Sequence, residues 1–211
     1  MVQRIITKTF LRVTFLTESF ILVDSLPLYE QYKPDFTKAI TEYFLWAFQI
    51  SIEINPIFKD EWNKHNKISF DVTIEHFKQV IHSGIPDKEI DEQRKAFFNG
   101  DNFYVFLINE KAIAGIAAFK KIDNVSGVLK TVYVRPSYRG KGYGESIIIK
   151  IIEIVRNKNY KKLKLETAPF FKSARKIYSK LGFKPIAYFP EDSFPKDWSE
   201  KMKLLYMELE L

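Results

Sequence analysis

Arg139-Gly140-Lys141-Gly142-Tyr143-Gly144 is the stretch of this sequence that decides the fold. It joins an extended apolar run, Val128 to Val134, to an isoleucine-rich helical run, Ile147 to Val155. The alternating glycines leave the backbone without Cβ atoms where it must approach a ligand closely. The following helix directs its free N–H groups and the positive end of its dipole at the same space. The order strand, glycine loop, helix therefore predicts an anion-binding loop, and Arg139 and Lys141 add positive charge suited to a diphosphate.

The spacing of this loop argues against two common nucleotide-binding loops. A P-loop places Lys and then Ser or Thr after its last glycine, but Lys141 precedes the last two glycines. The dinucleotide fingerprint would begin at Gly140 and would require glycine or alanine at the position of Glu145. Glu166, in the next apolar stretch, is the one feature that favours a ribose-binding Rossmann unit. The loop lies two thirds along the chain, which leaves no room for a doubly wound sheet after it.

Apolar residues around the loop alternate first with period two and then with helical spacing. The predicted strands are Phe103–Ile108, Ala112–Lys120, Val128–Val134, Leu163–Thr167 and Leu204–Leu209. One predicted helix is Gly144–Arg156. The other contains Ala174, Ile177, Tyr178 and Leu181 and ends at Gly182. The first three strands form an antiparallel meander, and the crossover through the loop helix makes a parallel βαβ unit. The pattern indicates a mixed α/β fold.

The N-terminal half predicts short strands and then helices. Apolar runs at Leu11–Leu16 and Phe20–Val23 fit strands, and Pro27 breaks the extension. Helical spacing predicts helices from after Pro34-Asp35 to about Ile50, from about Val72 to His82 and from Asp87 to Phe98. The short apolar segments fit either the first strands of the sheet or a homodimer contact, and both alternatives stay open.

Composition narrows the class of protein. The 211 residues suffice for one domain with a sizeable core, and the absence of cysteine excludes disulfides, thiolate metal sites and a cysteine acyl-enzyme. No pair among His65, His76 and His82 has the spacing of a helical metal site, so we expect no metal. Without an apolar run of membrane-spanning length or a signal peptide, the sequence predicts a cytoplasmic enzyme. The net charge of +7 suits any acidic partner, but the lysine pairs lack interleaved aromatics, which makes nucleic acid an unfavoured partner.

The loop spacing Arg-x-x-Gly-x-Gly and its neighbours resemble the GNAT superfamily of acetyl-CoA-dependent N-acetyltransferases. The resemblance covers Phe103 to Leu211 and rests on the strand and loop from Val132 to Gly144, the following helix, the strand Leu163–Thr167 and the segment Ala174–Phe183. It implies a mixed, mostly antiparallel twisted sheet flanked by helices, with extra N-terminal helices. We expect a single domain over residues 1–211, in which residues 1–100 shape the substrate side and residues 101–211 bind acetyl-CoA.

The resemblance also implies a reaction and its residues. The acetyl group would pass directly from acetyl-CoA to a primary amine, of a small molecule or a peptide, in a ternary complex and without a metal. The strand backbone at Val132, Tyr133 and Val134 would hold the pantetheine arm, and the amides of Arg139, Gly140, Lys141, Gly142, Tyr143, Gly144 and Glu145 would hold the diphosphate. Tyr178 would protonate the departing thiolate, although its place on an apolar helix stripe equally fits a core residue.

The catalytic base and the acceptor site are less well defined. Val128 stands where relatives carry a glutamate, so Glu166 or a water chain is the candidate base, and Phe171 replaces an asparagine of the family. In the insertion Tyr188–Lys201, Trp198 and Asp197 suit recognition of a cationic amine, although the composition equally describes a surface hairpin. Two alternatives to the enzyme are a non-catalytic acyl-CoA-binding module and a basic nucleic-acid-binding protein.

Overall fold

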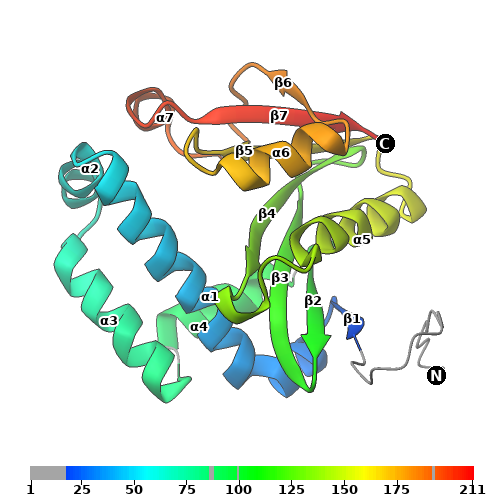
Figure 1. The fold of residues 1–211 in the computed structure, drawn as a ribbon, viewed down its shortest axis with the longest axis horizontal. Coiled ribbons are helices and arrows are strands. Elements are labelled where there is room, and N and C mark those ends of the chain that lie inside the picture. Colours follow the sequence, from blue (N-terminus) through cyan, green and yellow to red (C-terminus); the bar gives the residue numbers. More distant parts are fainter. Residues whose placement is uncertain (1–17, 86–87, 99, 192) are drawn as a thin grey trace.

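The computed structural model describes residues 18–85, 88–98, 100–191 and 193–211 (Figure 1). The strands are β1 (Glu18–Val23), β2 (Phe103–Asn109), β3 (Ala112–Lys121), β4 (Ser126–Val134), β5 (Lys162–Thr167), β6 (Lys184–Ile186) and β7 (Leu205–Glu210). The helices are α1 (Leu26–Ile54), α2 (Ile57–His65), α3 (Phe70–Ser83), α4 (Lys88–Phe97), α5 (Tyr143–Asn157), α6 (Lys172–Lys180) and α7 (Lys196–Lys201). The strands form one mixed, mostly antiparallel sheet in the order β1-β2-β3-β4-β5-β7-β6, which confirms the predicted fold class.

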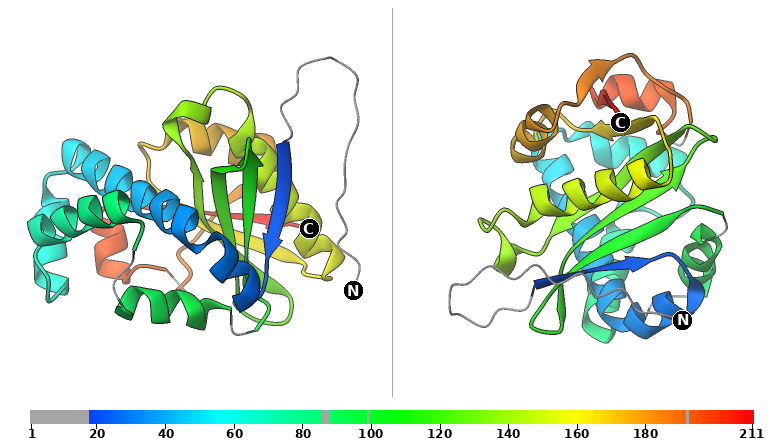
Figure 2. Two further views of the ribbon diagram at one scale, coloured as in Figure 1. Left: turned by 90° about the horizontal axis from the view of Figure 1, so that it is seen from below. Right: turned by 90° about the vertical axis from the view of Figure 1, so that its right-hand side faces the viewer.

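Helices cover both faces of this sheet (Figure 2). On one face, α5 packs Ile147, Ile148 and Ile151 against the strands, and on the other face α1 packs Phe36 and Ile40. Because β2 and β3 lie between these layers, their side chains are buried on both sides and read as almost unbroken apolar runs. The two apolar clusters that result are the main core of the protein.

Helix α1 differs from the sequence prediction, which began it after Pro34. The helix begins at Leu26, with Pro27 in its first turn, where a missing N–H costs nothing, and it continues through Pro34. The buried residues Phe36 and Ile40 hold the helix against the sheet, and this burial outweighs the hydrogen bond that Pro34 cannot make. Helix α2 was not predicted at all.

The structure describes one of the two short apolar segments before Pro27. Strand β1 pairs antiparallel with β2 over Glu18–Val23, so the predicted strand Phe20–Val23 is an edge strand of the sheet. The other predicted strand, Leu11–Leu16, lies outside the described residues.

Strands β4 and β5 separate from each other halfway along their length. Their parallel ladder runs only from Ser126 opposite Lys162 to Val128 opposite Lys164. Further along β4, the register against β3 shifts between Ile116 and Ala118, and Thr131 takes a left-handed φ of 53°. This bulge bends β4 away from β5. The result is an opening in the middle of the sheet, and the glycine loop follows β4 after a short 3-10 helix, Pro136–Tyr138.

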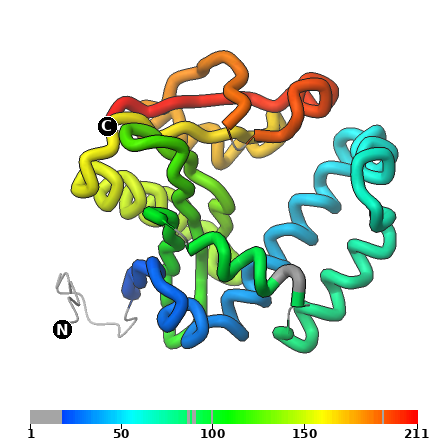
Figure 3. The backbone as a smooth tube through the Cα atoms, turned by 180° about the vertical axis from the view of Figure 1, so that it is seen from behind, coloured from blue at the N-terminus to red at the C-terminus, as the bar shows by residue number. Residues whose placement is uncertain are grey.

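The insertion between β6 and β7 is neither a plain hairpin nor part of the sheet. It contains α7, whose Trp198 is only 7% exposed and packs with Phe58 and Phe70 of the N-terminal helices. In Figure 3, α7 and α2 accordingly meet at the end of the molecule away from the chain termini. The C-terminal insertion and the N-terminal helices are therefore in direct contact.

Candidate functional site

The glycine loop after β4 presents bare backbone to the opening between the strands. Gly140 and Gly142 take left-handed φ angles of 80° and 81°, which side-chain-bearing residues rarely adopt. A Cβ atom at either position would meet no protein atom within 4 Å, so the space above the loop is open. Gly142 caps α5, whose first backbone bond runs from Ser146 N to Gly142 O at 3.1 Å. The amides ahead of that bond have no acceptor within the helix and suit an anion.

The side chains of the loop have other partners. Arg139 Nε donates to the carbonyl oxygen of Val134 at 3.0 Å, and its guanidinium lies 5.1 Å from the centre of the Trp46 ring. The Glu145 carboxylate, an unfavourable charge beside an anion, is paired with Lys180 of α6 at 2.6 Å. The loop can therefore bind an anion through its backbone amides, and the Lys180 ammonium offsets the negative charge of Glu145.

Tyr143 and Lys141 have structural positions around the loop. The Tyr143 hydroxyl donates to Glu18 at 2.5 Å and accepts from Asn109 at 3.1 Å, which anchors the start of α5 to β1 and β2. The Lys141 ammonium lies 5.8 Å from the centre of the Tyr138 ring. Lys141 does not line the cavity described next, whereas the other nine predicted cofactor-binding residues do.

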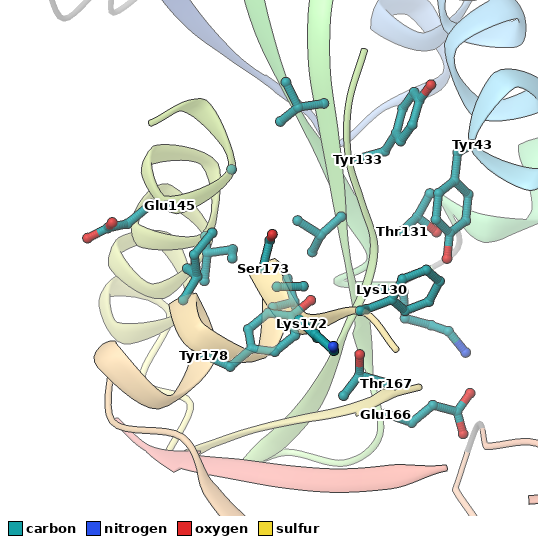
Figure 4. A pocket seen from close by; sticks show the side chains of 18 of the residues that line it. Tyr43, Lys130, Thr131, Tyr133, Glu145, Glu166, Thr167, Lys172, Ser173 and Tyr178 are labelled. Atoms are coloured by element: carbon teal, nitrogen blue, oxygen red, sulfur yellow. The ribbon is translucent and has the colours of Figure 1, made fainter. Parts of the chain in front are cut away.

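A cavity of about 600 Å³ fills the opening between β4 and β5, within the usual range of small-molecule sites (Figure 4). Its glycine-loop end is lined by Val132, Tyr133, Val134, Arg139, Gly140, Gly142, Tyr143, Gly144 and Glu145. Its other end is lined by side chains of α1, the ends of β4 and β5, the start of α6 and the β6–β7 connection. These are Tyr43, Trp46, Ile50, Lys130, Thr131, Glu166, Thr167, Phe170, Phe171, Phe189 and Ser193.

The β4 backbone borders this cavity without a ladder partner on the β5 side, because the ladder ends at Val128 and Lys164. The side chains of Val132 and Val134 pack toward the α5 side, while the Tyr133 ring faces α1. The peptide groups of this stretch that point away from β3 are therefore available to an extended ligand arm, as in strand addition to a sheet edge, except for the Val134 carbonyl, which accepts from Arg139.

Tyr178 lies on the wall of the cavity and in the core at the same time. The residue is only 6% exposed, and its ring packs against Phe183 at a centroid distance of 5.7 Å. Desolvation by burial, followed by the nearby Tyr43, raises the pKa of the Tyr178 hydroxyl well above its usual value. The hydroxyl therefore keeps its proton at neutral pH and can donate it.

Glu166 lies at the end of the cavity away from the glycine loop and is the second-last residue of β5 (Figure 4). Its carboxylate accepts the Phe194 amide at 3.3 Å. The Tyr43 side chain reaches into the same end from α1, and desolvation and the charge of Glu166 raise the pKa of Tyr43 to about 12. A carboxylate and two tyrosines that stay protonated thus surround the space beyond the glycine loop.

Sequence reasoning missed Tyr43 and Trp46, although it assigned the substrate side to the N-terminal helices. Both residues are aromatic and lie on the same helix as the core positions Phe36 and Ile40. In the sequence they therefore look like further core residues. The proposed amine recognition by Trp198 finds no support, because this side chain packs against α2 and does not line the cavity. Val128, in place of the family's glutamate, is buried in the paired part of β4.

In the described part of the chain, no group of three or more His, Asp or Glu side chains is arranged to hold a metal ion. None of the helices in the described ranges combines the length and hydropathy needed to cross a bilayer.

Comparison with known proteins agrees with this geometry. The model of the acetyltransferase (GNAT) family matches residues 27–183. An uncharacterized N-acetyltransferase of Bacillus subtilis, YsnE, is 34% identical over 85 residues, which are 38% of this chain and 56% of that protein. An uncharacterized Escherichia coli N-acetyltransferase, YjgM, is 28% identical over 107 residues, which are 49% of this chain and 64% of that protein. The chain thus spans less than two thirds of the length of either relative.

Solved structures show the same fold at low identity. The PaiA N-acetyltransferase of Thermoplasma acidophilum, solved in complex with coenzyme A, aligns with a TM-score of 0.58 at 15% identity over 92% of this chain and 99% of that one. A GNAT acetyltransferase of Staphylococcus aureus aligns over the same shares with a TM-score of 0.56 at 20% identity. Since the family model covers well over half of the sequence and the loop, cleft and sheet agree with it, this chain belongs to the acetyltransferase (GNAT) family.

Proposed function

We propose that this protein transfers the acetyl group of acetyl-CoA to a primary amine, by direct attack in a ternary complex. The observation that supports the proposal most is the continuity of the cavity. One end is bordered by the bare glycine loop and the unpaired β4 backbone, and the other end by Tyr178, Tyr43 and Glu166. A single ligand arm can therefore reach from an anion site to a group of proton-transferring side chains.

The residues present fit acetyl-CoA. Its diphosphate would lie on the amides from Arg139 to Glu145, and its pantetheine arm along Val132 to Val134. The thioester supplies an acetyl carbon that is activated for attack by an amine nitrogen. Transfer forms a C–N bond, breaks the C–S bond, releases one proton from the amine and delivers one proton to the sulfur.

Tyr178 and Glu166 are the side chains proposed to handle these two protons. Tyr178, whose raised pKa keeps it protonated, donates from its hydroxyl to the leaving sulfur. Glu166, which borders the same end of the cavity as Tyr178, accepts the proton of the amine directly or through water. The loop and strand fix the position of the acetyl donor, and this positioning lowers the barrier without a covalent intermediate.

Calorimetric titration with acetyl-CoA tests the proposal, with Gly142→Asp as the informative variant. We expect micromolar binding by the wild type and none by the variant, because a carboxylate on the loop repels the diphosphate. Gly100→Asp is the matched control, since Gly100 also has a left-handed φ and open space around it but lies outside the cavity. Equal loss of binding in both variants would point to strain and not to the loop.

Release of coenzyme A in the presence of amines then separates the alternatives. Turnover supports the acetyltransferase, and binding without turnover of any amine would instead indicate a non-catalytic acyl-CoA-binding module. A folded wild type that binds no acetyl-CoA but associates with DNA or RNA in a salt-dependent way would replace the proposal with a nucleic-acid-binding protein.

A further inference from the structure

The acceptor end of the cavity is bounded by contacts between parts of the chain that are far apart in sequence. We call residues 26–83, which form α1, α2 and α3, the helical arm. The arm touches the rest of the molecule across the cavity at two places, one at α6 and one at α7. Both contacts are made chiefly by aromatic side chains.

The first contact joins α1 to the start of α6. The Trp46 ring stacks on Phe171, with ring centroids 5.1 Å apart and planes 27° apart. On its other side, Trp46 contacts Tyr133 of β4 at 6.0 Å and the Arg139 guanidinium at 5.1 Å. Because these partners come from β4, the glycine loop and α6, Trp46 spans the opening where β4 and β5 separate.

The second contact joins α2 to α7. The Trp198 ring packs against Phe58 at 6.0 Å, Trp62 at 6.5 Å and His65 at 6.0 Å. Beside these rings, the Lys201 ammonium binds the Glu61 carboxylate at 2.8 Å, and that carboxylate side chain is only 4% exposed. Lys64, on the same helix as Glu61, binds the other carboxylate oxygen at 2.9 Å. The insertion is therefore fastened to the arm by packing and by a charge pair.

Between these two contacts lies the space where an acceptor must meet Glu166. Its walls are Tyr43 and Ile50 of α1, Phe170 before α6, and Phe189 and Ser193 of the β6–β7 connection. An extended peptide needs a continuous path of about 3.3 Å per residue and room for its side chains on both sides. Here, rings in contact close the line between the arm and α6 at the first place and between the arm and the insertion at the second.

We propose that the acceptor is a small free amine with an apolar or aromatic body, and that the Trp46–Phe171 and α2–α7 contacts exclude peptide and protein amines. This inference rests on the proposed acetyl transfer and names its substrate class. The aromatic walls stabilise such a molecule in two ways. They pack against its apolar body, and they attract its ammonium group before that group loses a proton to Glu166.

The test compares acceptors in one coenzyme A release assay. The small amines are 2-phenylethylamine, 1,5-diaminopentane and spermidine, and the large acceptor is an eight-residue peptide with a free N-terminus and one lysine. We expect kcat/KM for the best small amine to exceed that for the peptide by at least about 100-fold, the scale on which a shaped pocket discriminates. Peptide turnover equal to that of the best small amine would overturn the inference and leave the acetyltransferase standing.

Variants of the α2–α7 contact identify what sets the limit. Trp198→Ala is expected to raise peptide turnover relative to small amines by about tenfold or more, since it removes the ring that contacts Phe58, Trp62 and His65. Lys201→Ala removes the ion pair between α7 and Glu61 without a cavity in the core and should give a smaller change in the same direction, which keeps the test valid if Trp198→Ala does not fold. Lys196→Ala is the control, because within the described part of the chain this exposed lysine of α7 pairs with Glu200 of its own helix, at 3.9 Å.

Calorimetry with acetyl-CoA distinguishes the two levels of failure. All three variants should bind acetyl-CoA like the wild type, because none of these residues lines the cavity. If no amine of either size turns over, the proposed function fails and the inference with it. If the variants turn over small amines but leave the ratio of peptide to small amine unchanged, the α2–α7 contact does not set the acceptor size.

Discussion

Backbone groups form one end of the cavity, and side chains form the other. The cofactor end consists of backbone, namely two left-handed glycines, the first amides of α5 and an unpaired stretch of β4. The acceptor end consists of side chains, many of them aromatic, from α1, β4, β5, the start of α6 and the β6–β7 connection. Backbone sites tolerate changes of side chain but not of backbone conformation, whereas the acceptor end changes with every ring that lines it. The first end suits one donor, and the second can be altered to suit different acceptors.

Tyr178, where the two ends meet, should show the largest effect. Tyr178→Phe keeps the ring packed against Phe183 but removes the proton, so we expect kcat to fall by about 10²–10⁴-fold, the usual range for a general acid. The KM for acetyl-CoA should stay nearly constant. Steady-state kinetics over pH 6–9 measure both, and the wild type should keep its activity at high pH because burial raises the pKa of Tyr178.

Tyr160→Phe is the matched control for this variant. Tyr160 is also a buried tyrosine of the same core cluster, but its hydroxyl donates to Asp101 at 3.2 Å and it does not line the cavity. If the two variants reduce kcat equally, Tyr178 is a core residue and the leaving sulfur is protonated by another group.

Glu166→Gln probes the acceptor end and should have a somewhat smaller effect. The amide oxygen of glutamine still accepts the Phe194 N–H, so the local structure is kept while the proton acceptor is lost. We expect kcat/KM for the amine to fall by about 100-fold, the lower end of the range for general bases, because water at this end of the cavity partly replaces the carboxylate. Amine dependence at several pH values measures the loss, with the exposed Glu200→Gln of α7 as control. Unchanged kinetics would assign the base to water alone.

The geometry of the glycine loop was predictable from the sequence for a physical reason, while its binding of acetyl-CoA stays a prediction. A backbone cradle needs glycines at fixed spacing after a strand and before a helix, and this requirement is local, so the residues from Val132 to Glu145 display it directly. The meander, the crossover and α5 followed from apolar periodicity and are confirmed. Apolar periodicity did not predict the opening between β4 and β5, because a bulge at Thr131 has no signature in the sequence.

The acceptor end was not predicted in comparable detail, because its residues meet only in three dimensions. Tyr43 and Trp46 lie in a long apolar helix, where nothing distinguishes a cavity wall from a core position. Trp198 illustrates the converse, since an aromatic residue among acidic neighbours suggested amine recognition and instead packs on α2. Phe171 was noted only as a departure from the family's asparagine, whereas its ring stacks on Trp46.

The Trp46–Phe171 pair should contribute a smaller, measurable energy to the acceptor end. A double-mutant cycle with Trp46→Leu and Phe171→Leu should give a coupling energy of about 1 kcal/mol in urea unfolding, the value typical of stacked rings beyond their burial. Trp46→Leu should also raise the KM of the small amine. The cycle Trp46→Leu with Phe103→Leu is the control, because Phe103 stacks on Phe119 inside the other core cluster and should show no coupling. A coupling near zero for the first pair would mean that the two rings are merely neighbours.

The smallest effect concerns the charge pair that fastens α7 to the arm. Hydrogen bonds from Lys201 and Lys64, which outweigh desolvation, lower the pKa of Glu61 from 4.5 to about 2. A carboxyl whose pKa is lowered on folding stabilises the folded state fully above 4.5 and loses this contribution as the pH falls toward 2. The urea midpoint of the wild type should therefore drop over this range more steeply than that of Glu61→Gln, which cannot titrate.

Glu75→Gln is the control and should follow the wild type, because Glu75 is exposed and pairs with Lys78 at 3.2 Å within α3. Because Glu61 belongs to the α2–α7 contact and not to the cofactor end, acetyl-CoA binding at neutral pH should be the same in all three proteins, and a difference there would show that the two ends are coupled.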